Sequence, residues 1–260
     1  MTNMFYPERH HPVFMLQDAL KTEGVFAEYH KDEITSNMWG LTINAKVFVW
    51  LIDNRWAHEA AHEDPAAREL IANGALVCCA QKPDAERIGA KWLPLAVTPG
   101  YTTLEKPVKK IADCGFVGYV RDAGREQSLL DLAARFSTAF AQGAFGKEAV
   151  TTYWQSRLGI NIPTRYGDVQ AYDSANMRCF EILATGTPLV TPYEDYLLEL
   201  GFVHGANSFF YRSPQDLLNV VHDALRNHDL EAIGNEGAKL ASEQHTYTHR
   251  AKQVMTWLTA

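Results

Sequence analysis

The sequence of 260 residues lacks the long apolar stretches that membrane proteins and secretory leaders require. No uninterrupted apolar run approaches the ~18 residues that a membrane-spanning helix needs. The N-terminal residues, M-T-N-M-F-Y-P-E-R-H-H-P, do not combine a basic segment with a following apolar one, so they do not resemble a signal peptide. We therefore expect a cytoplasmic protein.

Cysteine is scarce as well, with only Cys78, Cys79, Cys114 and Cys179 present. Their spacing matches neither a pair of zinc ligands nor the dense pattern of a disulfide scaffold. Cysteines that are neighbours in sequence, such as Cys78 and Cys79, rarely form a disulfide with each other. The sequence predicts four reduced thiols that pack as small apolar side chains.

An excess of positive charge is also absent, because the formal net charge is -7. This balance disfavours broad, non-specific attraction to a polyanion, although a local patch could still contact one. The one compact basic cluster is Lys106, Lys109 and Lys110, and most such clusters are solvated linker surface.

The composition is that of an ordinary globular protein, with 47% hydrophobic and 21% charged residues. Apolar runs of strand length alternate with segments of helical spacing, which predicts an α/β fold with parallel sheets. The predicted strands are Val47–Ile52, Ala75–Ala80, Phe116–Val120, Leu158–Ile162 and Leu189–Thr191. The predicted helices include Glu126–Phe136, Pro214–Arg226 and a last one over His245–Leu258.

A polar stretch, Thr98 to Lys110, interrupts this alternation with two prolines, a glycine and several lysines. Such a stretch is typical of a linker between lobes. We predict an N-terminal lobe over residues 1–110, a C-terminal lobe over 111–245 and a final helix over 246–260.

The segment Asn176 to Val190, N-M-R-C-F-E-I-L-A-T-G-T-P-L-V, predicts a short helix that is apolar on nearly every side. Only Arg178 and Glu181 interrupt the apolar surface, and their spacing of three places them on one face. Buried charges are costly unless they meet each other or a polar ligand. Gly186 and Pro188 are expected to end the helix.

The start of this helix offers unpaired backbone N–H groups and a positive dipole to an anion such as a phosphate. Glu181, one turn further on, can accept hydrogen bonds from a ribose diol. Asn176 and Arg178 would assist the phosphate, and Asn176 can equally serve as an ordinary N-cap. Together these features predict a nucleoside diphosphate as the ligand.

Several segments resemble glycosyltransferases with two Rossmann-like lobes, the GT-B type, and among these the group similar to the CgeB spore proteins. The matching segments are F-V-G-Y-V-R-D-A-G-R-E (116–126), L-G-I-N-I (158–162), Asn176–Val190, H-T-Y-T-H-R-A (245–251) and, more faintly, residues 80–96. The resemblance implies two Rossmann-like lobes with a shortened N-terminal lobe, because M-F-Y-P-E-R-H-H-P supplies no glycine-rich first turn. It also implies that the last helix packs back across the lobes.

The resemblance assigns residue roles at the donor site. Glu181 takes the place of the glutamate that holds the ribose, and Asp173 that of an acidic residue touching the donor sugar. Arg121 and Arg125, which follow Gly118, correspond to basic residues that neutralise the diphosphate leaving group. For both arginines the alternative is that they cap or solvate the following helix.

The activity that the resemblance implies is transfer of a sugar from a nucleoside-diphosphate sugar, with UDP as the expected nucleotide, to a hydroxyl acceptor. No metal is expected, because related families use helix dipoles and basic side chains instead. Short relatives in bacteriophages add sugars to hydroxymethylated bases, which makes modified DNA a candidate acceptor. A non-catalytic protein that only binds sugar nucleotides is an alternative.

H-E-A-A-H at residues 58–62 is a literal H-E-x-x-H zinc motif, which raises a zinc metallopeptidase as another alternative. Pro65 should end a helix soon after His62, and the flanking residues are only alanines, which counts against this interpretation. The motif follows the strand predicted at Val47–Ile52. Within the glycosyltransferase interpretation, Asp53 is the first candidate for the catalytic base and His58 the second, and a loop-capping role for Asp53 is equally open. His245 and His249 have metal-compatible spacing but are expected to pack.

Overall fold

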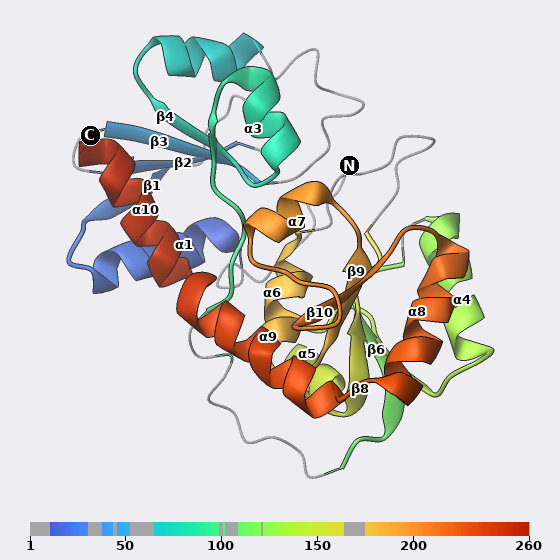
Figure 1. Ribbon diagram of the computed structural model, residues 1–260. Helices are drawn as coiled ribbons and strands as arrows, with labels where there is room; N and C mark the ends of the chain where they lie inside the picture. The colour runs from blue at the N-terminus through green and yellow to red at the C-terminus, as the bar shows by residue number, and fades with distance from the viewer. Residues whose placement is uncertain are drawn as a thin grey trace. The chain divides into compact units, whose positions relative to one another are not determined.

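The computed structural model describes residues 11–30, 38–43, 46–52, 65–98, 101, 109–120, 122–163 and 175–259 (Figure 1). The chain divides into two compact units, each built from helices and one five-stranded sheet. The first unit combines Met1–Thr98 with Thr246–Ala260, and the second unit is Pro99–His245. The predicted α/β fold class is confirmed.

The sheet of the first unit has the strand order β1-β2-β3-β4-β5. Its strands are β1 (Ala27–His30), β2 (Met38–Ile43), β3 (Lys46–Leu51), β4 (Leu76–Cys79) and β5 (Lys91–Trp92). β3 and β4 are parallel, as predicted, and β5, which was not predicted, is parallel to β4. β1, β2 and β3 pair antiparallel. Only two residues separate β2 from β3, and this is too short for the crossover that parallel strands need.

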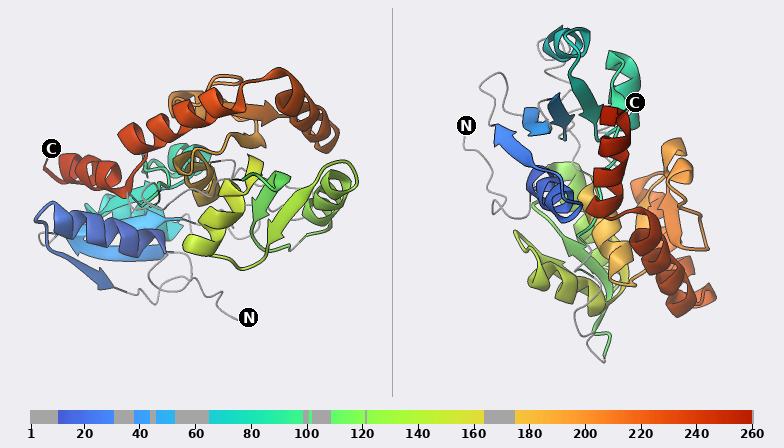
Figure 2. Two further views of the ribbon diagram at one scale, coloured as in Figure 1. Left: turned by 90° about the horizontal axis from the view of Figure 1, so that it is seen from below. Right: turned by 90° about the vertical axis from the view of Figure 1, so that its left-hand side faces the viewer.

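The two faces of this sheet are covered by different helices. Val49, Leu51 and Val77 pack with α3 (Lys82–Ile88) and with a helical segment over residues 65–72. Trp50 points to the opposite face, where its ring meets Tyr247 edge to face at 6.4 Å between centroids. α10 (Tyr247–Thr259) lies beside α1 (Pro12–Thr22) on the Trp50 side (Figures 1 and 2).

Arg250 anchors α10 to the segment that follows β5. Its guanidinium donates from Nε to the Pro94 carbonyl at 2.7 Å and from Nη2 to the Leu95 carbonyl at 3.1 Å. Burial lowers the pKa of Arg250 to about 10, and Tyr247 acts in the opposite direction. The C-terminal helix is therefore part of the core of the first unit.

The sheet of the second unit is parallel throughout, with the order β10-β9-β8-β6-β7. Its strands are β6 (Ala112–Val117), β7 (Thr138–Ala141), β8 (Ser156–Ile160), β9 (Leu189–Pro192) and β10 (Ser208–Tyr211). The chain passes from β6 to β7 on one side and then returns to place β8 on the other side of β6. The topology thus reverses between β6 and β8, and ligands of open α/β sheets bind at the carboxyl ends of the strands at such a point.

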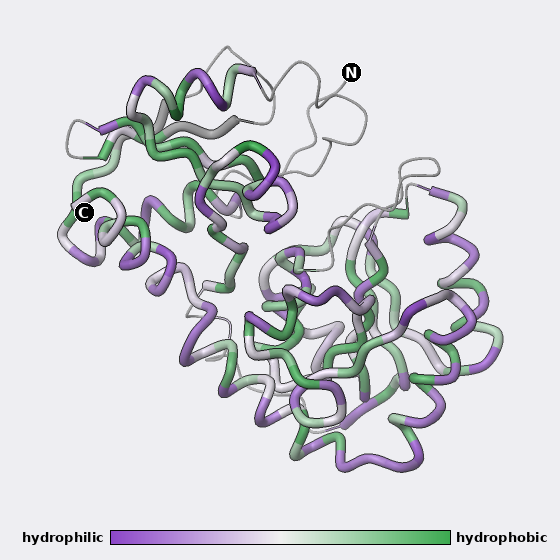
Figure 3. The backbone as a smooth tube through the Cα atoms, turned by 45° about the horizontal axis from the view of Figure 1, so that its top comes forward, coloured by the Kyte–Doolittle hydropathy of each residue, from purple (hydrophilic) through white to green (hydrophobic). Residues whose placement is uncertain are grey.

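Helices cover both faces of this second sheet (Figure 1). One face carries α4 (Ala123–Ala133) and α8 (Pro214–Asn227), and the other carries α5 (Lys147–Trp154), α6 (Met177–Ala184) and α9 (Leu230–Gln244). A short helix, α7 (Asp195–Glu199), follows β9. The strands are mainly hydrophobic along the backbone trace, whereas α4 and α8 alternate between hydrophobic and hydrophilic (Figure 3), as expected for helices with one buried face.

Two glycines allow α6 and its neighbours to approach closely. A Cβ built on Gly159 in β8 would lie 2.5 Å from Cγ2 of Ile182 in α6. A Cβ on Gly234 in α9 would lie 2.2 Å from the carbonyl oxygen of Gly186, in the turn after α6. α6 is therefore held tightly between β8 and α9, and its N-terminal end has a fixed place in the second unit.

The bounds of the predicted elements agree closely for α6 and α8 and less well for β6. β6 ends at Val117 and not at Val120, because Gly118 has φ +155°, a conformation that L side chains rarely adopt. All four cysteines are free and buried, as predicted. Among the described residues, no helix is both long and apolar enough to cross a membrane.

Candidate functional site

The candidate site lies where the carboxyl ends of β6 and β8 are neighbours. Gly118 follows β6 directly, Asn161 follows β8, and α6 begins at Met177 beside them. This is the reversal point of the second sheet, where the topology predicts a bound ligand.

Asn161 is the centre of a buried hydrogen-bond network, with no exposed surface. Its Oδ1 accepts hydrogen bonds from Nδ2 of Asn176 at 2.9 Å and from Nη1 of Arg178 at 2.7 Å. Its Nδ2 donates to Oγ1 of Thr191 at 3.0 Å and to Sγ of Cys179 at 3.2 Å. Asn161 lies in the segment L-G-I-N-I (158–162), and no role was predicted for it. A single polar residue directly after an apolar strand was the available signal.

Asn176 precedes α6 but does not cap it with its side chain. Its amide group is turned toward Asn161, and its Oδ1 is buried without a hydrogen-bond partner among the described residues. Of the two roles left open for Asn176, ordinary N-capping is thus excluded. Its expected contribution to phosphate binding stays a prediction.

Arg178 fastens α6 to the end of β6. Its Nε donates to the Val117 carbonyl at 2.7 Å, and its guanidinium lies over the Phe116 ring at 4.8 Å. A Cβ on Gly118 would lie 2.5 Å from Nη2 of Arg178, so only glycine leaves room for this side chain. Arg178 therefore positions the loop after β6, in addition to its predicted role in binding a phosphate.

Glu181 is half-buried and lies one turn into α6. Its Oε1 accepts a hydrogen bond from the Tyr101 hydroxyl at 2.9 Å. Burial raises the pKa of Glu181, while the Tyr101 hydrogen bond and the charge of Arg178 oppose that rise. Within the described residues Glu181 and Arg178 form no ion pair, since each has its own hydrogen-bond partners.

Tyr153 in α5 is close enough to Arg178 and Glu181 to feel the charges of both. Its side chain is completely buried, and its hydroxyl makes no hydrogen bond of ordinary geometry to a described residue. Burial raises the pKa of Tyr153, with Arg178 acting against the rise and Glu181 adding to it. Neither Tyr101 nor Tyr153 was predicted, because nothing in the local sequence connects them to Glu181.

Arg125 lies in the first turn of α4 and is buried. Its Nη1 donates to the Tyr119 carbonyl at 2.6 Å, and its guanidinium faces the Phe116 ring at 5.7 Å. These contacts fix the loop between β6 and α4, a structural role that differs from the alternative of capping or solvating the helix. Its predicted contact with a diphosphate remains a prediction, and Arg121 lies outside the described residues.

The predicted catalytic residues Asp53, His58 and Asp173 also lie outside the described residues, as does the H-E-x-x-H segment at 58–62. In the part of the chain that is described, no group of three or more His, Cys, Asp or Glu side chains could hold a metal ion. His245 packs against Phe180, with ring centroids 5.1 Å apart, and its Nε2 bonds the Leu200 carbonyl at 2.8 Å.

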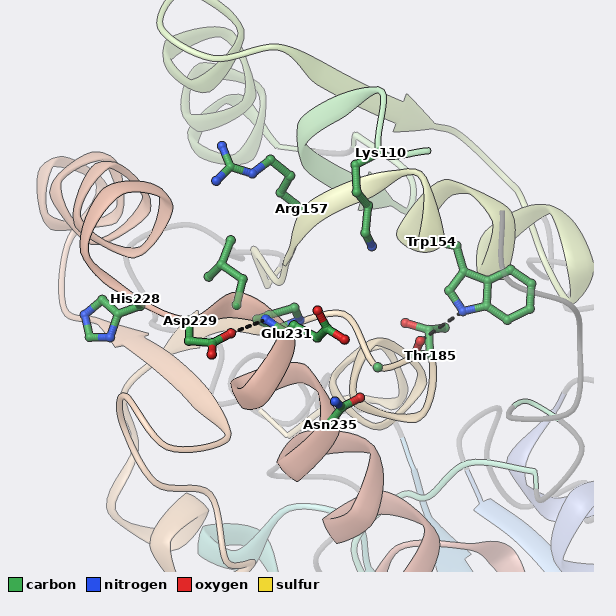
Figure 4. A pocket seen from close by; sticks show the side chains of 11 residues that line it. Lys110, Trp154, Arg157, Thr185, His228, Asp229, Glu231 and Asn235 are labelled. Carbon is green, nitrogen blue, oxygen red and sulfur yellow. Dashed lines mark hydrogen bonds between the residues drawn. The ribbon is translucent and has the colours of Figure 1, made fainter. Parts of the chain in front are cut away.

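A separate pocket of about 490 Å³ opens at the opposite, amino-terminal edge of the second sheet (Figure 4). Three of its charged residues already have partners. Lys110 donates to the Ser156 carbonyl at 2.8 Å, Arg157 pairs with Asp113 at 3.3 Å, and Asp229 caps α9. Because ligands of parallel sheets bind at the carboxyl ends of the strands, we assign the functional site to the β6–β8 edge and not to this pocket.

The fold and site define an α/β protein with a helix start and a carboxylate at the reversal point of a parallel sheet. The model of a family described as "Glycosyl transferase-like" matches residues 122–256, which is more than half of the 260 residues. The chain therefore belongs to this family, which agrees with the predicted class, glycosyltransferase. The match runs from the start of α4 into α10.

Solved structures with a similar fold are GT-B glycosyltransferases, which confirms the predicted architecture of two Rossmann-like lobes. Sucrose-phosphate synthase from Thermosynechococcus elongatus is 12% identical with a TM-score of 0.56, over 79% of this chain and 64% of that one. Anabaena Alr3699/HepE, solved with UDP, is 15% identical with a TM-score of 0.58, over 78% of this chain and 69% of that one. The pneumococcal O-GlcNAc transferase GtfA, solved with UDP and GlcNAc, is 10% identical with a TM-score of 0.51, over 90% of this chain and 51% of that one.

The chain thus spans less than two thirds of the synthase and about half of GtfA. No curated protein sequence matches it.

Proposed function

We propose that this chain transfers a sugar from a nucleoside-diphosphate sugar, with UDP as the nucleotide, to a hydroxyl acceptor, and that the second unit binds the donor. The observation that carries the proposal is the position of Glu181 and the start of α6 at the reversal point between β6 and β8. A helix start, a glycine turn and a carboxylate within one helical turn are the parts that a nucleoside diphosphate needs.

The diphosphate is proposed to lie against the start of α6 and the backbone of Gly118. The first N–H groups of a helix have no partner within the helix, and the helix dipole favours an anion there. Gly118 brings the backbone of the loop after β6 to the same edge without a side chain in the way. Anabaena HepE, which has a similar fold, was solved with UDP and with UDP-glucose.

The ribose is proposed to bind the carboxylate of Glu181. An ionised carboxylate has about four acceptor positions, and Tyr101 uses one of them on Oε1. The remaining positions are free to accept from ribose hydroxyls, one helical turn away from the phosphate end of α6. Asp173, outside the described residues, is the proposed contact of the donor sugar.

The decisive experiment compares E181Q with E236Q, a matched change at an exposed glutamate of α9. We expect the affinity for UDP, measured by calorimetry, to fall about 10-fold or more in E181Q, because a charge-assisted hydrogen bond to ribose is lost. E236Q should bind as the wild type does. Unchanged UDP binding by E181Q would show that the donor site is assigned wrongly.

Turnover separates an enzyme from a protein that only binds the donor. Incubation with UDP-sugars should release UDP, and D53N should retain UDP binding while transfer is lost, because Asp53 is the proposed base that deprotonates the acceptor. His58 is the second candidate for this role. Binding without any release of UDP across a panel of UDP- and GDP-sugars would favour the non-catalytic alternative.

The specific acceptor that we propose for testing is a hydroxymethylated base in bacteriophage DNA. Two observations weigh against an extended DNA surface. The net charge is -7, and Lys110 donates to the Ser156 carbonyl at the edge away from the proposed donor site. Salt-dependent binding of modified DNA that is weakened by changes at Lys106 and Lys109 would support this acceptor. Absence of binding at low salt would exclude it.

A further inference from the structure

Tyr101 makes a direct contact with the proposed ribose carboxylate from 80 residues earlier in the chain. Its hydroxyl donates to Oε1 of Glu181 at 2.9 Å, and only 8% of its side-chain surface is exposed. Both residues belong to the second unit. None of the donor-binding roles proposed above requires this tyrosine.

The contact matters because the surroundings of Glu181 oppose its charge. Burial favours the neutral acid, whose proton would occupy one of the oxygens that should accept from ribose. Among the described residues, the titratable or charged groups that act on Glu181 are Tyr101 and, at longer range, Arg178. Arg178 is held by the Val117 carbonyl and Asn161, so Tyr101 supplies the direct hydrogen bond.

We propose that Tyr101 is a positioning residue for donor binding, which fixes Oε1 of Glu181, keeps the carboxylate ionised and leaves Oε2 to accept from the ribose. This inference rests on the proposed function.

The direction of the hydrogen bond is also determined by the surroundings. Burial and the nearby charge of Glu181 raise the pKa of Tyr101, so the phenol keeps its proton at neutral pH and donates. The backbone N–H of Gly146 acts in the opposite direction on the same oxygen.

Tyr153 provides a matched control within the same site. It is buried, its hydroxyl feels the charge of Glu181, and it makes no hydrogen bond of ordinary geometry to a described residue. The change Tyr153→Phe therefore removes the same atom from the same neighbourhood without removing a bond to the carboxylate. Any effect that is common to Y101F and Y153F does not come from the bond to the carboxylate.

The test is calorimetric binding of UDP and of 2′,3′-dideoxy-UDP to the full chain between pH 5 and pH 8. We expect Y101F to bind UDP about 3- to 10-fold more weakly at neutral pH, with little change for the dideoxy compound, because one hydrogen bond to a charged group is lost. The loss of UDP affinity on acidification should also begin at a higher pH in Y101F. Removing a donor to the charged form raises the pKa of the carboxyl group.

Two further variants make the result decisive. E181Q carries no titratable group, so adding Y101F to E181Q should weaken UDP binding no further and introduce no pH dependence. Thermal unfolding checks that each variant is folded. Should Y101F be unfolded, Y101H keeps a ring N–H donor in its place and is expected to retain the preference for UDP over the dideoxy compound.

The inference is overturned if Y101F matches the wild type for both ligands at every pH, or if Y153F shows the same loss. Additive effects of Y101F and E181Q would overturn it as well. A wild-type chain that binds no UDP contradicts the proposed function itself. If the wild type binds UDP more tightly than the dideoxy compound and Y101F does so to the same extent, only the role of Tyr101 is contradicted.

Discussion

At the scale of single residues, Asn161 joins more elements of the site by hydrogen bonds than any of the predicted site residues does. It joins the end of β8 to β9 through Thr191 and to α6 through Asn176 and Arg178. The Tyr211 hydroxyl adds a bond from β10 to the Asn161 carbonyl at 2.9 Å. An uncharged side chain with both donors and an acceptor can serve all these partners at once.

Removing this side chain should cost both stability and donor affinity. We expect N161A to lower the free energy of unfolding by about 2 to 4 kcal/mol, because buried polar partners such as Arg178 and Asn176 are left unsatisfied. Urea unfolding measures this change. N227A, which removes an exposed amide of α8 bonded to Asp223, should change stability by less than about 0.5 kcal/mol. Equal effects of the two substitutions would contradict the role of Asn161.

The residues that could be predicted from the sequence are those whose role follows from a local pattern. Arg178 and Glu181 were recognisable because they are the only charges on an otherwise apolar helix. Asn161, Tyr101 and Tyr153 depend on contacts between distant segments, which periodicity and spacing do not contain. For the same reason the protein partners of Arg178 and Glu181 could not be predicted, since each charge bonds a residue from a distant segment.

At the scale of elements, helices and strands with a strong local sequence pattern were predicted with accurate bounds, and those with a weak pattern were not. α6 matches its prediction because Gly186 and Pro188 end a compact apolar segment. β7, Thr138–Ala141, was missed because it is an edge strand without a fully buried residue. α9 was not predicted, because Gly234 and Gly237 lower helix propensity, although they allow close packing against α6.

This packing predicts opposite effects for two glycine-to-alanine changes. G234A should destabilise the protein by about 1 to 3 kcal/mol, because the new Cβ would meet the Gly186 carbonyl oxygen and force α9 away from the turn after α6. G124A, in the first turn of α4, should be neutral or stabilise by up to about 1 kcal/mol through better helix propensity.

Thermal and chemical unfolding of the two variants measure these effects. If G234A is as stable as the wild type, α9 does not pack as closely on the Gly186 turn as the structure indicates. The position of the start of α6 would then be less tightly determined than the donor site requires.

At the scale of the whole molecule, the fold class was predictable because alternating strands and helices leave few arrangements. The antiparallel β1–β2–β3 part of the first unit was not predicted, because the residues on either side of the short β2–β3 connection show no clear strand periodicity. The predicted bound at residue 110 came from the composition of the linker and stays a prediction, and the two compact units divide at Thr98 and Pro99. The return of the last helix to the first unit came from the family resemblance and not from any local pattern.

The division into two units predicts that their stabilities can be changed separately. R250A should destabilise the first unit by about 2 to 4 kcal/mol, because the Pro94 and Leu95 carbonyls lose a buried charged donor. UDP affinity, which we assign to the second unit, should stay within about two-fold of the wild type in folded protein. K252A, at an exposed neighbour in α10 that pairs with Glu23 at 3.7 Å, is the matched control and should change little.

Calorimetric unfolding with and without UDP separates the two responses, because a ligand stabilises only the unit that binds it. A large loss of UDP affinity in folded R250A would show that the first unit contributes to nucleotide binding. An unchanged unfolding temperature would show that Arg250 does not hold α10 in place.

The residues of the first unit come from both ends of the chain, and the whole of the second unit is inserted between them. During synthesis on a ribosome, which proceeds from the N-terminus, all of Pro99–His245 is therefore translated before α10 exists. Until α10 has been made, the Trp50 side chain in the sheet of the first unit lacks the Tyr247 ring that packs against it. The second unit is thus completed before the first unit, although the first strand of the first unit is made before any part of the second.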